Sequence, residues 1–397
     1  MAALYIHVPF CASRCIYCGF YSTLTPTKRE LRNKILDRYV SALCGEIRMR
    51  KDYFERMLLP DTPRIETIYL GGGTPSQLSF EHLNCIFSEI QHTFGLTVSD
   101  LRAMEITIEC NPDDITEAFA ADLERLPINR VSMGVQTFSD DRLRFLRRRH
   151  TASHIDMAVT HLRNSGIKNI SIDLMFGFPN ETLPEWKTDI EKALSLNIEH
   201  ISAYSLMYEE STPLYALLEK GKVRDMEEET YRQMYDLLID TLNYAGYEQY
   251  EISNFAKLDR EKGNEQSPFR SQHNAAYWQN KPYLGLGASA HSYNLSHRHW
   301  NIADLMNYMR GIEEQKLCCE TEEIDEQTHY NDLITTALRM KEGLSINELS
   351  PHFKSYVLRM AAPYLESNRL VLHNGRLSLT REGIYVSDAI MAELMYV

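Results

Sequence analysis

Three cysteines near the N-terminus carry the clearest chemistry in this sequence. Cys11, Cys15 and Cys18 form a CxxxCxxC pattern in a single short loop. Zinc sites normally take four ligands, most often from two separated CxxC pairs. Three thiolates in one loop instead suit three corners of a cubane iron–sulfur cluster, which leaves one iron open to bind another molecule. A zinc knuckle with a distant fourth ligand and three unrelated thiols are the alternatives.

Polar and glycine residues follow several short apolar segments that we interpret as strands. Glycines in a turn allow the backbone to approach a ligand closely, and carboxylates can bind an ammonium group or accept hydrogen bonds from hydroxyls. The carboxyl ends of parallel strands lie at one edge of a sheet, where such folds place their chemistry. The residues at these positions are the turn Gly71–Thr74, Glu109, Gln136 and Asp173.

Six strand-and-helix units are expected to position these residues. Apolar patterning predicts strands at 4–8, 67–70, 105–109, 130–135, 169–174 and 200–206, with helices at 27–56, 79–94, 116–124, 140–145, 153–165 and 183–196. Alternating strands and helices imply a parallel sheet with right-handed crossovers. Six units are too few for a closed eight-unit barrel, so we predict an α/β fold built on a partial, open (β/α)6 barrel.

The pattern changes after residue 210. An aromatic, histidine-rich stretch occupies 273–300, and the last part reads as helices followed by a hairpin at 369–379 with the turn Asn374-Gly375. We therefore predict a barrel at 1–210, a connecting region at 211–320 and a smaller C-terminal α+β domain at 321–397, which is winged-helix-like.

Composition limits the classes of partner. The 397 residues are 44% hydrophobic and carry a net charge of −13, so the chain can bury a core but is not suited to non-specific nucleic-acid or anionic-membrane binding. No apolar run approaches the roughly 18 to 20 residues of a membrane span, and the first residues lack the features of a signal peptide. We expect a cytoplasmic protein whose cysteines are reduced thiols or metal ligands.

The cysteine pattern, with Tyr17 before the third cysteine, resembles the radical S-adenosylmethionine superfamily. In matching order, YIHVPFCASRCIYC, GGGTPS, VSMGVQTF, IDLMFGFP and HNAAYW resemble the HemN/HemW group of oxygen-independent coproporphyrinogen oxidases and their haem-chaperone relatives. The resemblance implies a radical-SAM partial barrel and a HemN-like C-terminal domain. It also implies a [4Fe-4S] cluster on the three cysteines, whose open iron binds the amino and carboxylate groups of S-adenosylmethionine.

The same resemblance implies which residues bind S-adenosylmethionine. Within the run LRRRH we favour Arg148 over Arg147 and Arg149, because a guanidinium can bind the ligand carboxylate with two hydrogen bonds, although such a run is usually a solvated helix face. Tyr5 matches a family tyrosine near the cluster. The alternative interpretation is that Tyr5 is an aromatic residue of the core that belongs to a strand. The implied set is Tyr5, Gly72, Gly73, Thr74, Glu109, Gln136, Arg148 and Asp173.

Two features favour the haem-chaperone branch of the group. Phe20 lies two residues after Cys18, where members with oxidase activity tend to carry a fourth cysteine. Cys11 also lies close to the N-terminus, whereas the oxidase branch has a longer N-terminal extension. Both differences are expected if this chain does not oxidise coproporphyrinogen.

The segment HNAAYW, residues 273–278, resembles the HNxxYW motif of the chaperones. A histidine can ligate haem iron and aromatic rings can stack on a porphyrin, so His273, Tyr277 and Trp278 are candidates for binding haem. The nearby His291, His297 and His299 could supply another ligand. The alternative is a surface histidine beside a packed aromatic pair.

These observations predict a haem chaperone rather than a coproporphyrinogen III dehydrogenase. It would bind haem, the [4Fe-4S] cluster and S-adenosylmethionine, and would deliver haem to apo-proteins, with peripheral contact to membrane haemoproteins as one route. The alternative is an oxygen-independent coproporphyrinogen III oxidase, in which a deoxyadenosyl radical takes a hydrogen from a propionate side chain. A methyltransferase that uses the same cofactor is a third, weaker reading.

Overall fold

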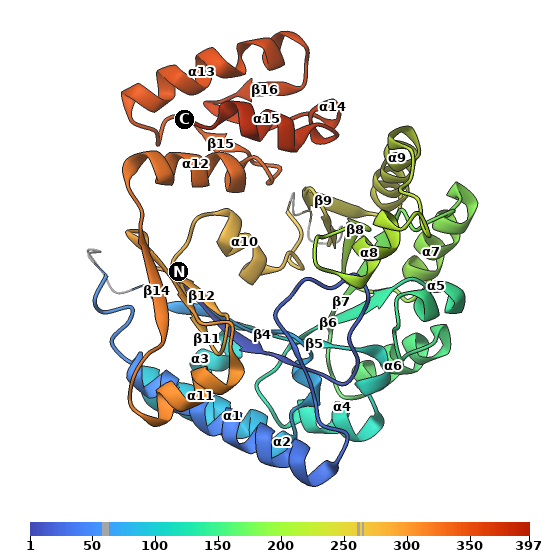
Figure 1. Cartoon of the computed structure of the whole chain (residues 1–397). Coiled ribbons are helices and arrows are strands. Elements are labelled where there is room, and N and C mark those ends of the chain that lie inside the picture. The colour runs from blue at the N-terminus through green and yellow to red at the C-terminus, as the bar shows by residue number, and fades with distance from the viewer. Residues whose placement is uncertain (58–62, 260–262, 264–265) are drawn as a thin grey trace.

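The computed structural model describes residues 1–57, 63–259, 263 and 266–397 (Figure 1). Six parallel strands form the centre of its main sheet: β1 (Ala2–Val8), β4 (Ile65–Gly72), β5 (Glu105–Cys110), β6 (Arg130–Gln136), β7 (Asn169–Phe176) and β8 (His200–Ser205). They lie side by side in chain order, and every neighbouring pair is parallel. The predicted open α/β barrel of six strands is confirmed.

The sheet is wider than the sequence predicted. A seventh parallel strand, β11 (Tyr283–Leu286), pairs with β1, and antiparallel strands β12 (His291–Tyr293), β13 (His297–Asn301) and β14 (Cys319–Glu323) continue that edge. At the other edge, β10 (Asn254–Lys257) and β9 (Tyr247–Glu251) follow β8. Segment 211–320 thus supplies strands to both edges, and its predicted boundaries stay predictions.

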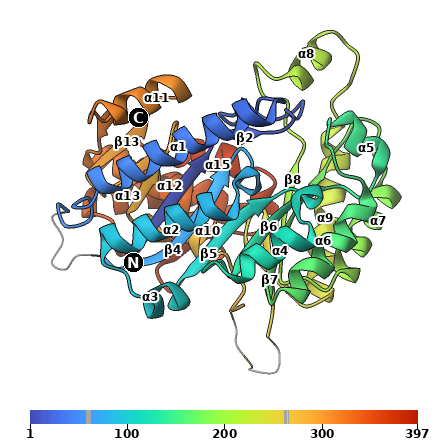
Figure 2. The same ribbon diagram turned by 90° about the horizontal axis from the view of Figure 1, so that it is seen from below.

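Helices cover the outer face of the sheet (Figure 2). The longer ones are α1 (Arg29–Met49), α2 (Phe80–Phe94), α6 (Ala152–Asn164), α7 (Leu183–Ser195) and α9 (Glu228–Tyr244). Shorter ones are α3 (Val98–Ala103), α4 (Glu117–Glu124), α5 (Asp140–Phe145) and α11 (Leu305–Glu313). The 3-10 turns η1 (Pro75–Gln77) and η2 (Pro112–Asp114) follow β4 and β5. Helix α8 (Pro213–Glu219) lies apart from this layer, and its Leu214 packs with Ile16 of the cysteine loop. No helix of the described part of the chain is both long and apolar enough to cross a membrane.

Alternation along the strands divides the sheet into an apolar face and a polar face. Val131, Met133 and Val135 of β6 are buried in the main core with helix residues such as Ile86. The residues that follow each of them, Ser132, Gly134 and Gln136, line a cavity. Because side chains alternate along a strand, the same backbone packs on the helices and presents polar groups on its other side.

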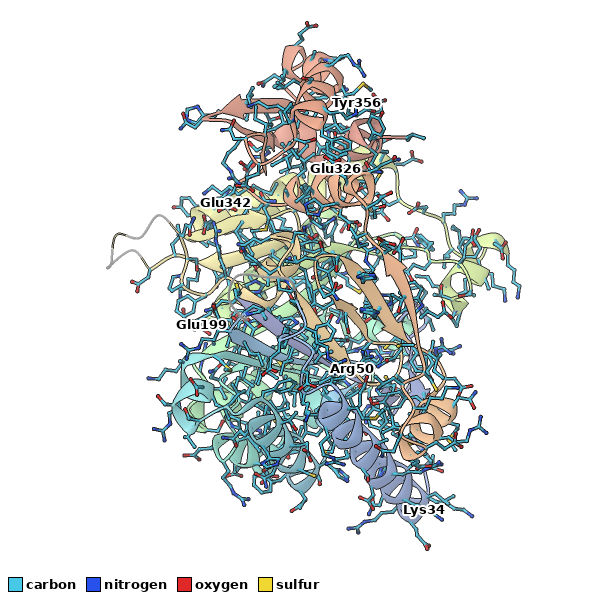
Figure 3. All side chains as sticks on the ribbon, turned by 90° about the vertical axis from the view of Figure 1, so that its left-hand side faces the viewer. Lys34, Arg50, Glu199, Glu326, Glu342 and Tyr356 are labelled. Carbon is cyan, nitrogen blue, oxygen red and sulfur yellow. The ribbon has the colours of Figure 1, made fainter. Side chains whose placement is uncertain are left out.

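The C-terminal part has its own core, which includes Tyr330, Ile334, Val357, Leu377 and Ile390. It contains α12 (Glu326–Ala337), α13 (Pro351–Glu366), α14 (Arg381–Ile384) and α15 (Ser387–Leu394) around a small sheet of β15 (Leu344–Ser345), β17 (Arg376–Leu379) and β16 (Leu370–His373). The predicted hairpin is confirmed, and its turn residues Asn374 and Gly375 both have positive φ, at 50° and 73°. Figure 3 shows this part, marked by Tyr356 and Glu326, above the main sheet.

Candidate functional site

A cavity lies at the carboxyl ends of the parallel strands, and the three N-terminal cysteines lie at its wall. Ten of the eleven residues predicted for the cluster and S-adenosylmethionine line it: Cys11, Cys15, Cys18, Gly72, Gly73, Thr74, Glu109, Gln136, Arg148 and Asp173. We call this space the cluster cavity. Residues separated widely in sequence meet there because each follows, or ends, one of the neighbouring strands.

The glycine turn holds the cysteine loop against the sheet. Gly73 donates its N–H to the Val8 carbonyl at 2.9 Å, and a Cβ on Gly73 would lie 2.8 Å from that oxygen. Gly72 has a φ of +109°, and a Cβ there would lie 2.5 Å from the His7 ring. Both glycines are therefore required by close packing of the turn against the strand that leads into the loop.

The thiols have surroundings that suit a metal cluster. All eight cysteines are free, and burial raises the pKa of Cys11 and Cys18. Thr74 Oγ1 lies 3.6 Å from Cys11 Sγ, and Arg148 Nη1 lies 3.6 Å from Cys15 Sγ. Bound metal favours the thiolate form, so a cluster would offset the effect of burial on these groups.

Arg148 and Arg149 both line the cluster cavity, whereas Arg147 does not. Helix α5 ends at Phe145, and Arg147 has a φ of 60°, which turns the chain back toward the sheet. Arg148 Nη2 then donates to Asn111 Oδ1 at 2.7 Å. Its Nε is buried and has no hydrogen-bond partner among the described residues. An arginine that lines a cavity and keeps one guanidinium N–H without a partner fits an anionic ligand such as a carboxylate.

Gln136 reaches the cluster cavity through an irregularity in β6. The register between β6 and β7 shifts between Gly134 and Gln136, and Gln136 has a φ of 68°. A non-glycine residue with positive φ inside a strand is uncommon and costs free energy, so it persists only where the surrounding structure imposes it. Such bulges redirect side chains next to functional sites.

Two carboxyl groups, those of Glu109 and Asp173, line the cluster cavity. Glu109 accepts hydrogen bonds from the Tyr69 hydroxyl at 2.8 Å and from the Gly72 N–H at 3.0 Å. Burial raises the pKa of Glu109 to about 7, with a further contribution from Asp173, and burial raises the pKa of Asp173 to about 6. Each group can therefore change protonation near neutral pH when a cationic ligand arrives.

We expect Glu109 to make the stability of the ligand-free protein depend on pH. Its folded-state pKa of about 7 exceeds the ordinary value of 4.5, so the folded chain holds this proton more tightly than the unfolded chain. The stabilisation is complete below pH 4.5 and is lost as the pH rises through 7. When the pH is raised from about 5 to about 8, the free energy of unfolding, measured with denaturant, should fall more for the wild type than for Glu109→Gln. Equal decreases in the two proteins would contradict a raised pKa of Glu109.

Tyr5 does not line the cluster cavity. Its hydroxyl hydrogen-bonds His7 Nδ1 at 3.0 Å, and its side chain lines a second cavity with Phe20, Tyr277 and Trp278. Phe20 lines both cavities, so they are adjacent. Two of the three residues predicted to bind haem, Tyr277 and Trp278, are thus at this second cavity.

His273 is buried, so the alternative of a surface histidine is wrong. It lies on α10 (Gln272–Trp278), which packs on the inner face of the sheet. His273 is only 1% exposed. Its Nδ1 hydrogen-bonds Thr67 Oγ1 and its Nε2 hydrogen-bonds the Tyr277 hydroxyl, each at 2.8 Å. Burial lowers the pKa of His273 to about 3, so the ring is neutral. These two hydrogen bonds occupy both ring nitrogens of His273. His273 does not line the second cavity, whereas its hydrogen-bond partner Tyr277 does.

Several contributors to the cluster cavity were not identified from the sequence. Asn111 lines the cavity and binds Arg148, and Arg149 forms ion pairs with Asp113 and Asp114 at 2.8 and 2.6 Å. Asn111 follows the predicted strand 105–109 after one residue. This position near the end of a predicted strand, which Glu109, Gln136 and Asp173 also occupy, could have identified it. Nothing in the sequence indicated the ion pairs of Arg149, because they join a helix-end loop to a 3-10 turn.

Comparison with known proteins places the chain in a family. Residues 5–193 match the sequence model of the radical SAM superfamily, and residues 324–386 match that of the HemN C-terminal domain. The "Heme chaperone HemW" of Bacillus subtilis is 35% identical over 87% of this chain and 85% of its own length. The protein of that name from Lactococcus lactis is 30% identical over 98% and 96%.

A solved structure shares the fold. Coproporphyrinogen III oxidase HemN from Escherichia coli, described as a radical SAM enzyme, superposes with a TM-score of 0.80 over 99% of this chain and 90% of its own, at 21% identity. At that identity the likeness shows the architecture alone. The family follows from the sequence relatives: this chain belongs to the HemW family of radical SAM proteins.

Proposed function

We propose that this chain is a haem chaperone of the cytoplasm that binds haem, a [4Fe-4S] cluster and S-adenosylmethionine and delivers haem to apo-proteins, including membrane haemoproteins reached by peripheral contact. The observation that carries the proposal is Phe20, whose side chain is 70% exposed and lines both cavities. An exposed aromatic side chain between two cavities favours an apolar ligand, and it offers no thiol for chemistry at that point. The relatives named as heme chaperones support the same function.

The cluster cavity supports the cofactor part of the proposal. Cys11, Cys15 and Cys18 would hold the [4Fe-4S] cluster, and a cluster with bound S-adenosylmethionine supplies one-electron radical chemistry. Arg148 would bind the methionine carboxylate through its unpaired Nε, and Glu109 or Asp173 would bind the ammonium group or ribose hydroxyls.

We expect loss of a polar group from the cluster cavity to weaken S-adenosylmethionine binding. Asp173→Ala and Gln136→Ala each remove one hydrogen-bonding side chain, at a cost of about 1–3 kcal/mol, or about 5- to 150-fold in affinity. Calorimetry on the anaerobically reconstituted protein measures the effect, and circular dichroism checks the fold. Asp156→Ala, an exposed site on α6, should bind as the wild type does. Wild-type affinity in both cavity variants would mean that the ligand binds elsewhere.

The alternative function, oxidation of coproporphyrinogen III, is tested directly. We expect reconstituted protein, given S-adenosylmethionine, a reductant and coproporphyrinogen III, to form no protoporphyrinogen IX. The reason is that Phe20 cannot supply the additional thiol that the resemblance associates with oxidases. Conversion at a catalytic rate would overturn the chaperone proposal in favour of the enzyme.

A further inference from the structure

The second cavity has the size and walls of a site for a flat apolar molecule. Its volume is about 500 Å³, and its lining includes the aromatic side chains of Tyr5, Phe20, Tyr21, Tyr277, Trp278, Tyr283 and Tyr293. We call it the aromatic cavity. Small-molecule sites typically occupy about 300–1,000 Å³ and are lined by aromatic residues with a few placed polar groups. The rings of Tyr277 and Tyr283 meet edge to face with centroids 4.6 Å apart, so that wall is fixed by packing.

Three histidines lie in or beside this cavity, and two of them are occupied. His7 lines it, but its Nδ1 hydrogen-bonds the Tyr5 hydroxyl and its Nε2 hydrogen-bonds the Tyr21 carbonyl, each at 3.0 Å. His273 lies behind the wall with both nitrogens bonded, as described above. Neither can bind a metal without first losing a buried hydrogen bond.

His291 differs from both. It lies on β12 and lines the aromatic cavity, and its imidazole makes no hydrogen bond to any residue in the described ranges. Its ring stacks on Trp300 with centroids 5.8 Å apart, which restrains its orientation. Partial desolvation of its ring, together with the nearby Arg298, lowers the pKa of His291, so its imidazole is neutral and retains a lone pair at neutral pH.

Cations lie at the same cavity. Lys281 is exposed and has no ion pair with any residue that the structure describes. Arg298 lines the cavity while its guanidinium pairs with Asp332 at 2.7 Å and Glu322 at 3.1 Å. An aromatic slot with a free imidazole and a free ammonium matches a planar tetrapyrrole that carries a metal and carboxylate side chains.

We propose that the aromatic cavity is the haem site of this chain and that His291 is the iron ligand. The inference rests on the proposed function, since it names where and how that function's ligand binds. Phe20 then stands between the haem site and the cluster cavity. His273 is a positioning residue: its hydrogen bond fixes the Tyr277 hydroxyl, and Tyr277 forms the wall.

The test is a haem titration of anaerobically reconstituted protein, followed by absorbance difference and electron paramagnetic resonance spectra. We expect the wild type to show a histidine-ligated haem. We expect His291→Ala to lose that signature and to bind haem at least about tenfold more weakly, the loss typical even of groups that support a metal ligand. Added imidazole should restore the signature, because it replaces the deleted donor. His297→Ala, on the neighbouring strand β13 and outside the cavity lining, should match the wild type.

The outcomes separate this inference from the function on which it rests. A wild-type protein that binds no haem would overturn both. A wild type that binds haem while His291→Ala retains its affinity and signature would overturn the ligand assignment alone. We expect His273→Ala to weaken binding but keep the histidine signature. Loss of the signature in His273→Ala, rescued by imidazole, would assign the iron to His273 and also overturn the inference.

Discussion

Replacing Cys11, Cys15 and Cys18 together by alanine is expected to leave the protein almost free of iron. Anaerobically reconstituted wild type should be brown and contain about four irons per chain, because three thiolates can hold a cubane cluster. Each single alanine variant should lose most of this iron, since two thiolates and a neighbouring Arg148 cannot hold the cluster. Iron analysis and absorbance spectra measure the effect.

The matched control uses cysteines that lie elsewhere. Cys318 and Cys319 are also free thiols, but Cys319 begins the edge strand β14, Cys318 directly precedes it, and neither lines the cluster cavity. Replacing both by alanine should leave the iron content unchanged. Iron content that survives the triple change would end the cluster assignment, and iron lost in the control would show that the thiols act indirectly through the fold.

Gly72→Ala is expected to destabilise the protein by about 3 kcal/mol or more, through positive φ and overpacking together. The added Cβ would lie 2.5 Å from the His7 ring, whose two nitrogens are held by hydrogen bonds, so the ring cannot move freely. Because this turn docks the cysteine loop, we also expect poorer cluster retention. Denaturant unfolding under reducing conditions gives the change in free energy.

Gly95→Ala provides the matched control for that change. Gly95 also has a positive φ, at +63°, but no atom lies within 4 Å of where its Cβ would be. The Gly95→Ala substitution should therefore lower the free energy of unfolding by only about 1 kcal/mol, from backbone strain alone. The difference between the two variants measures the packing of the turn against His7. Equal costs would contradict the close approach that we describe.

The central strands were predictable because their residues alternate or run apolar between glycine and proline turns. Strand β4, for example, ends in the Gly71–Gly73 turn, and β5 ends before Asn111-Pro112. The outer strands could not be predicted in this way. β12 and β13 read HSY and HRHWN, without an apolar period, and they form because β11 pairs with the distant β1. Such long-range pairing leaves no local pattern.

The candidate site was predictable where chemistry is local in sequence. The three cysteines share one loop, and Glu109 and Asp173 interrupt apolar strands near their ends. Tyr5 was harder to place, because β1 pairs with β11, which was not predicted, and the second cavity that Tyr5 lines is built partly from β11. The burial of His273 depends on the packing of α10 against Thr67, which no short segment reveals.

Haem binding by the intact, reconstituted chain tests the central claim most directly. Adding haem under anaerobic conditions should shift the Soret band and saturate at about one haem per chain, because one aromatic cavity of suitable size adjoins the cluster cavity. The same preparation should leave coproporphyrinogen III unchanged. A titration with no saturable Soret shift, or the appearance of protoporphyrinogen IX over repeated turnovers, would contradict the assignment of this protein as a haem chaperone.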